Sequence, residues 1–94
     1  MKLKTTDLRL EKTSWAFPEQ YDVFLGEQCI GYLRLRNGIF RADYPECSAF
    51  GENTVYMANP KGDGEFEDDE REHFLDEACK ALIAAHERAT GEGP

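Results

Sequence analysis

Alternation of apolar and polar residues dominates the first half of the chain and predicts a series of short β-strands. We expect strands over residues 4–12, 21–25, 29–36, 39–44 and 54–58, the last of them a short apolar run. Glycine, asparagine and proline residues punctuate the segments between them, as is typical of turns and loops. The pattern therefore predicts a β-rich first half.

Asn37-Gly38 is the clearest turn signal, because both residues tolerate the positive φ angles of a two-residue hairpin turn. Such a turn fixes which side chains share a face. One face, which we take as the core, carries Leu33, Leu35, Phe40 and Ala42. The opposite face carries Tyr32, Arg34, Arg36, Ile39 and Arg41.

Two points of strand register stay open at this level. Ile30 would lie beside the arginines unless Gly31 marks a β-bulge that reverses the alternation. A three-residue loop at Gly26 would put the apolar residues of segment 21–25 on the core side, whereas a two-residue loop would not.

Helical spacing of apolar residues begins late in the chain and predicts one helix over residues 69–89. Asp69 followed three residues later by Glu72 resembles a capping box, and Gly91 marks the helix end. The expected apolar stripe comprises Phe74, Leu75, Ala78, Leu82, Ala85 and Ala89. We therefore expect a single α+β domain over residues 1–94, with the order β-β-β-β-β-α. Its antiparallel sheet would have four to five strands, with the helix packed on one face.

The charge of the chain is uneven and changes which partners are plausible. The 94 residues, enough for one domain, carry a net charge of −8, divided as +1 over residues 1–45 and −9 over residues 46–94. The acidic second half argues against nucleic acid as a partner, because phosphates would be repelled. It favours good solubility or a basic protein partner.

Cys29, Cys47 and Cys79 are odd in number and far apart, which is typical of reduced thiols in a cytoplasmic protein. The first ten residues alternate in polarity, unlike a secretory signal, and no apolar stretch approaches the length of a membrane span. We expect a cytoplasmic protein in which Cys29 and Cys79 are buried and Cys47 is exposed in a loop.

No metal-binding or catalytic pattern in the sequence is complete. A twelve-position calcium loop starting at Asn59 would place Lys61 where an oxygen ligand is needed. Cys79 and His86 lie two helical turns apart, too far to share one zinc ion. Cys47 has no base beside it in the sequence to activate it as a nucleophile. We expect no metal, no cofactor and no catalytic residue.

The arginine-bearing sheet face leads to the first functional hypothesis. One helix covers only one face of such a sheet, so the other face would expose Tyr32 and Ile39 among Arg34, Arg36 and Arg41. We expect a non-catalytic protein-interaction module that forms a symmetric homodimer through this face, with the arginines reaching carboxylates of the partner. Such a module could also neutralise or regulate a basic partner protein. The alternative is a monomer whose arginine stems pack over Tyr32 and Ile39.

Two further functional classes remain as alternatives. A small-molecule-binding protein or small enzyme would have its pocket between helix and strand ends, near Trp15, Tyr44, Cys47 and Tyr56, since pockets are commonly lined by aromatic residues. A single-strand nucleic-acid binder would use Tyr32 for base stacking, with Arg34, Arg36 and Arg41 as phosphate contacts.

The strand-turn-strand segment over residues 21–41, YDVFLGEQCIGYLRLRNGIFR, resembles a region of small uncharacterised bacterial proteins, some of them carried on mobile integron gene cassettes. The resemblance implies a small β-rich fold. It carries over no functional residue.

Overall fold

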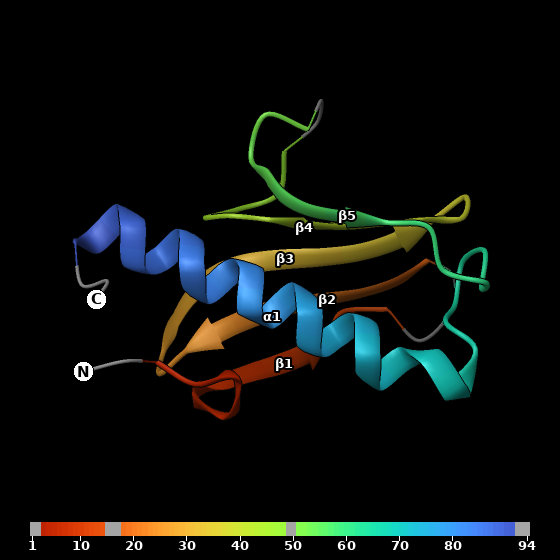
Figure 1. Ribbon diagram of the computed structural model, residues 1–94, viewed down its shortest axis with the longest axis horizontal. Helices are drawn as coiled ribbons and strands as arrows, with labels where there is room; N and C mark the ends of the chain where they lie inside the picture. Colours follow the sequence, from red (N-terminus) through yellow and green to blue (C-terminus); the bar gives the residue numbers. More distant parts are fainter. Residues whose placement is uncertain (1–2, 15–17, 49–50, 92–94) are drawn as a thin grey trace.

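The computed structural model describes residues 3–14, 18–48 and 51–91 and confirms an α+β fold with five strands followed by one helix (Figure 1). A 3-10 turn, η1, precedes the first strand. The elements in chain order are η1 (Thr5–Asp7), β1 (Leu8–Lys12), β2 (Glu19–Leu25), β3 (Gln28–Arg36), β4 (Ile39–Asp43), β5 (Thr54–Ala58) and α1 (Asp68–Thr90). The strands form one antiparallel sheet in the order β1-β2-β3-β4-β5, and α1 crosses one face of it obliquely (Figure 1). Among the strands, α1 makes its closest backbone contacts with β3, β4 and β5.

The first strand is shorter than expected. It begins at Leu8 and not at Lys4, because the residues between them form η1. Asp7 closes this turn: its carboxylate accepts a hydrogen bond from the Lys4 N–H at 2.8 Å, and its own N–H donates to the Lys4 carbonyl at 2.9 Å. A short polar side chain that bonds to nearby backbone competes with strand pairing in this way.

The β3–β4 hairpin agrees with the sequence analysis. Asn37 and Gly38 have φ angles of 55° and 75°, as a two-residue turn of this kind requires. Arg34 pairs with Arg41 across the hairpin. The expected core residues are all fully buried at 0% exposure: Leu33, Leu35, Phe40 and Ala42.

A β-bulge in β3 resolves the position of Ile30. Val23 pairs with Gly31 and Phe24 with Cys29, so Ile30 is the extra residue between them. Ile30 is 1% exposed and belongs to the core, away from the arginines. Cys29, which we expected to be buried, is exposed, because the bulge reverses the alternation at this point.

The loop at Gly26 has two residues, since Leu25 pairs directly with Gln28. Tyr21 and Val23 nevertheless point into the core, at 9% and 0% exposure. The expectation that a two-residue loop excludes them from the core was wrong, because the bulge supplies the compensating shift by one residue.

The helix begins one residue earlier than predicted and with a different capping pair. Glu67 is the N-cap residue, and its N–H donates to the carboxylate of Glu70 at 3.0 Å. The predicted pair of Asp69 and Glu72 therefore lies inside the helix. The end is as expected, with Gly91 in the left-handed conformation at φ 72°.

One face of α1 packs on the sheet. Its buried apolar residues are Ala78, Cys79, Leu82, Ile83 and Ala85, while Phe74 and Leu75 are half-buried. Ala89, predicted to continue this stripe, is exposed, because the last turn of the helix extends beyond the strands (Figure 1). Phe66, from the loop before the helix, completes the core against Phe40, with ring centroids 4.8 Å apart.

Candidate functional site

The face of the sheet that points away from α1, here called the open face, brings the predicted interface residues together. Arg34 pairs with Arg41, and Arg36 pairs with Ile39, so these side chains project from adjacent strands on the same side. Ile39 is 44% exposed, and Met57, which pairs with Arg41 from β5, is 60% exposed. Met57 belongs to this surface, and the sequence analysis did not include it because the register of β5 depends on a contact with β4.

A hollow of about 260 Å³ on the open face is lined by Arg34, Arg36, Asn37, Ile39 and Arg41. Like charges directly opposite each other on a sheet are destabilising, so the Arg34–Arg41 pair costs stability. Within the described residues, neither Arg34 nor Arg36 forms a salt bridge. Their guanidinium groups are therefore available to an acidic group from outside the chain.

Arg41 is held in place by contacts with Asp43 and with the loop after β4. Its Nε lies 3.3 Å from Asp43 Oδ1, and its Nη2 donates to the Ser48 carbonyl at 2.8 Å. Asp43 is 1% exposed and also accepts hydrogen bonds from the Ser48 N–H at 2.8 Å and from Thr54 Oγ1 at 2.9 Å. This network ties the loop after β4 to the sheet and fixes one wall of the hollow.

On β2, the open face carries the carboxylate of Asp22. Asp22 pairs with Tyr32 across β2 and β3 and forms no salt bridge among the described residues. Tyr32 donates its hydroxyl hydrogen to Gln20 Oε1 at 2.7 Å. Burial raises the pKa of Tyr32, although the charge of Arg34 opposes this, so the phenol remains a neutral hydrogen-bond donor.

The predicted pocket residues have different surroundings. Trp15 lies outside the described residues. The Tyr44 hydroxyl is 2.8 Å from His86 Nδ1 of α1, Tyr56 packs edge-on against a core phenylalanine, and Cys47 is exposed. A hollow between the helix and the sheet does exist, but it lies beside β1 and is lined by other residues.

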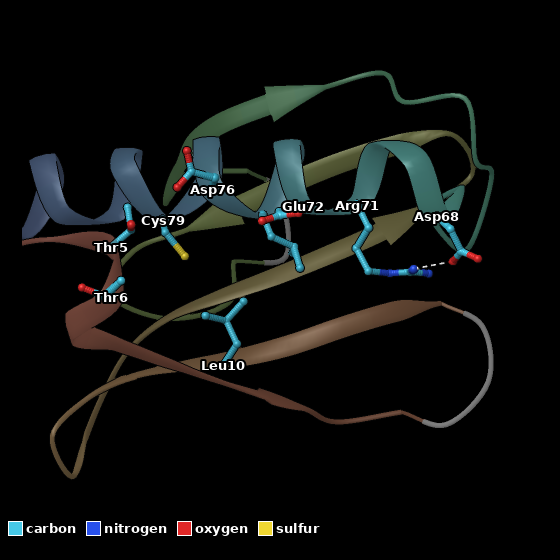
Figure 2. Close-up of a pocket in the computed structure, with 9 residues that line it drawn as sticks. Thr5, Thr6, Leu10, Asp68, Arg71, Glu72, Asp76 and Cys79 are labelled. Carbon is cyan, nitrogen blue, oxygen red and sulfur yellow. Dashed lines mark hydrogen bonds and ion pairs between the residues drawn. The ribbon is translucent and has the colours of Figure 1, made fainter.

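This second hollow is a groove of about 450 Å³ between α1 and the β1 side of the sheet (Figure 2). Its lining residues are Thr5, Thr6, Leu10, Asp68, Arg71, Glu72, Leu75, Asp76 and Cys79. Leu10 points from the sheet toward the helix, and the sulfur of Cys79 points back toward the sheet (Figure 2). Burial raises the pKa of the Cys79 thiol to about 11, with a further contribution from Asp76, so the thiol is protonated and unreactive at neutral pH.

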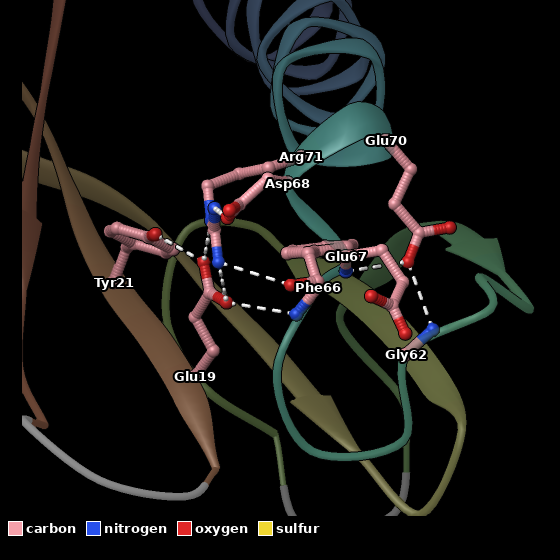
Figure 3. Close-up of polar contacts among 8 residues, drawn as sticks. All are labelled: Glu19, Tyr21, Gly62, Phe66, Glu67, Asp68, Glu70 and Arg71. Carbon is pink, nitrogen blue, oxygen red and sulfur yellow. Dashed lines mark hydrogen bonds and ion pairs between the residues drawn. The ribbon is translucent and has the colours of Figure 1, made fainter.

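A buried carboxylate fastens the start of α1 to β2 (Figure 3). Glu19, 1% exposed, accepts hydrogen bonds from Arg71 Nε at 2.9 Å, from the Phe66 N–H at 3.0 Å and from the Tyr21 hydroxyl. Burial alone would raise the pKa of Glu19, but the hydrogen bonds from Arg71, Tyr21 and Phe66 outweigh it and lower the pKa. The pKa of Tyr21 is raised, chiefly by burial and then by its hydrogen bond to Glu19. The pKa of Arg71 is also raised, chiefly by its hydrogen bond to Glu19.

A second carboxylate shapes the loop before the helix (Figure 3). Glu70 accepts hydrogen bonds from the N–H groups of Lys61 at 2.8 Å, Gly62 at 2.9 Å and Glu67 at 3.0 Å. These bonds lower the pKa of Glu70 even though burial opposes the shift. A Cβ atom at Gly62 would lie 1.9 Å from the Glu65 carbonyl oxygen, so this loop requires glycine there.

Among the residues that the structure describes, no group of three or more histidine, cysteine, aspartate or glutamate side chains could hold a metal ion. In the same part of the chain, no helix is long and apolar enough to cross a membrane.

Comparison of the chain with models of protein families, with curated proteins and with solved structures finds no match in any of the three. The functional argument therefore rests on the two surfaces described above: the open face and the groove beside β1.

Proposed function

We propose that this chain is a non-catalytic protein-interaction module that forms a symmetric homodimer through its open face. One observation carries the proposal: exposed Ile39 and Met57 lie next to Arg34 and Arg36, which form no salt bridge among the described residues, on the sheet face that α1 leaves uncovered. Apolar side chains interspersed with arginine are typical of the centre of a protein–protein interface.

The distribution of charge on the open face supports a self-complementary contact. Asp22 lies on β2, whereas the arginines lie on β3 and β4. A contact in which Asp22 of each copy pairs with Arg34 of its partner would occur twice about a two-fold axis, which is the isologous arrangement that a symmetric dimer requires.

Light scattering at micromolar protein concentration tests this proposal. The expected mass is about twice the 10.7 kDa of the single chain. Ile39→Asp would place an unpaired charge in the interface and should return the mass to that of the monomer. Ala89→Asp adds the same charge on the exposed last turn of α1 and should leave the dimer intact.

A wild-type mass of 10.7 kDa at all concentrations up to the millimolar range would refute the homodimer. Loss of the dimer in both variants would place the interface elsewhere, because Ala89 does not lie on the open face.

A further inference from the structure

β1 is an edge strand that borders the groove beside α1. Among the described residues it pairs only with β2. The Thr13 N–H donates to β2 at 3.0 Å, so by the alternation of an antiparallel ladder the N–H groups of Leu10 and Lys12 point away from β2. The Leu8 N–H belongs to the same outward set and is used by η1. Leu10 and Lys12 therefore present backbone groups that an added strand could pair with.

The groove next to this edge combines an apolar floor with an acidic wall. Leu10, Leu75 and Cys79 form the floor. The wall consists of Asp68, Glu72 and Asp76 on α1, and Glu72 forms no salt bridge within the described ranges.

The cation that lines the groove, Arg71, neutralises this wall only in part. Arg71 is bound to the buried carboxylate of Glu19 at 2.9 Å and to Asp68 at 2.7 Å. Its single charge is therefore shared between two carboxylates. Glu72 remains open to an outside cation, and Asp76 is paired only at the exposed helix surface, with Lys80 at 3.1 Å.

We propose that this groove binds an extended basic segment of a partner protein, which adds to the edge of β1 as a further strand. An apolar side chain of the segment would contact Leu10 and Leu75 on the floor, level with the stretch of α1 between Glu72 and Asp76. Lysine or arginine side chains two residues to either side would reach these two carboxylates. Backbone pairing with Leu10 and Lys12 would supply affinity, and the groove would supply specificity, as in other cases of strand addition. The proposal does not depend on the homodimer, because the groove lies on the helix side of the sheet.

A labelled, end-blocked heptapeptide with lysine, leucine and lysine at its second, fourth and sixth positions, and threonine elsewhere, tests the proposal. Fluorescence anisotropy should show saturable binding to the full chain, and the same peptide with glutamate in place of lysine should not bind. In nuclear magnetic resonance spectra, the amide groups of Leu10 and Lys12 should shift and exchange more slowly with solvent when the peptide is added. Those of Arg9 and Glu11, which face β2, should change less.

Glu72→Lys should weaken peptide binding about tenfold or more, equivalent to about 1.4 kcal/mol. Glu77→Lys is the matched control, because Glu77 lies on the same helix close enough to Tyr56 of β5 to raise its pKa, away from the groove. The Ile39→Asp variant should bind the peptide normally, which separates a failure of this proposal from a failure of the homodimer.

Absence of binding at millimolar peptide would overturn the proposal. So would equal losses in Glu72→Lys and Glu77→Lys, since these would indicate general attraction to an acidic chain. Unchanged Leu10 and Lys12 amide signals in the presence of bound peptide would likewise overturn addition of a strand at β1.

Discussion

Glu19 and Arg71 are separated by 52 positions in the sequence but are joined by two hydrogen bonds, of 2.9 Å from Nε and 3.2 Å from Nη2. The pair links the first residue of β2 to the first turn of α1, and it holds the acidic wall of the groove beside the sheet (Figure 3). Removing Glu19 would leave Arg71 with only the exposed carboxylate of Asp68 and without its buried counter-charge, which is costly.

Glu19→Gln should therefore lower the free energy of unfolding by about 3 kcal/mol, the lower end of the range for a broken buried pair, because Arg71 keeps partial access to water. Urea unfolding followed by circular dichroism measures this. Glu65→Gln, at an exposed position of the loop before α1, is the control and should change stability little. A loss below about 1 kcal/mol for Glu19→Gln would show that the network contributes little to stability.

The contribution of Glu19 to the free energy of unfolding should depend on pH. Its pKa in the folded chain is lowered from the ordinary value of 4.5. Its contribution is therefore complete above that value and is lost as pH falls from 4.5 through the lower pKa of the folded state. The stability difference between wild type and Glu19→Gln should shrink over this acidic range in urea titrations at successive pH values. A constant difference would contradict the lowered pKa.

Arg34→Thr should separate stability from binding at the open face. It removes one member of the like-charged pair with Arg41, so the free energy of unfolding should rise by roughly 0.2–1 kcal/mol. The measurement requires protein concentrations at which light scattering gives the monomer mass. Arg36→Thr, where the residue opposite is Ile39, should give no such gain. In the dimer range, Arg34→Thr should weaken association, and unchanged association would argue against the proposed pairing with Asp22.

A side chain at position 31 in place of Gly31 should destabilise the fold while Leu82 is present. An added Cβ would lie 2.9 Å from Leu82 Cδ2 and 3.2 Å from the Asp43 carbonyl oxygen. Gly31→Ala should cost about 1–3 kcal/mol through overpacking. In the Leu82→Ala background, which leaves a cavity, the same substitution should cost clearly less, and a double-mutant cycle of urea unfolding measures the coupling. Additive losses would show that the contact with Leu82 is not the cause.

The three cysteines should differ in reactivity with a thiol reagent. Cys29 and Cys47 are exposed and should react in the folded chain, whereas Cys79 is buried, with a pKa raised to about 11, and should react only when the chain unfolds. Counting modified thiols by mass spectrometry with and without denaturant distinguishes them. Cys79→Ser should abolish the labelling that requires denaturant, and rapid labelling of all three thiols in the native chain would contradict the burial of Cys79.

Local chemistry made much of the fold predictable from the sequence. Asn37 and Gly38 specify a hairpin turn by their tolerance of positive φ, and that turn sets the register of β3 and β4 and hence the arginines of the open face. The helix was equally predictable, because apolar spacing and the Gly91 stop signal are properties of neighbouring residues.

Tertiary structure alone decided the features that join distant segments. The bulge at Ile30 depends on how β2 pairs with β3, and it reverses which side chains reach the core. Glu19 alternates with Tyr21 on the core side of β2, but a carboxylate can be buried there only because Arg71 arrives from the helix. The groove beside β1 likewise arises because α1 packs most closely on β3, β4 and β5. Turn and helix signals act between near neighbours, whereas these contacts depend on how the whole chain packs around its core.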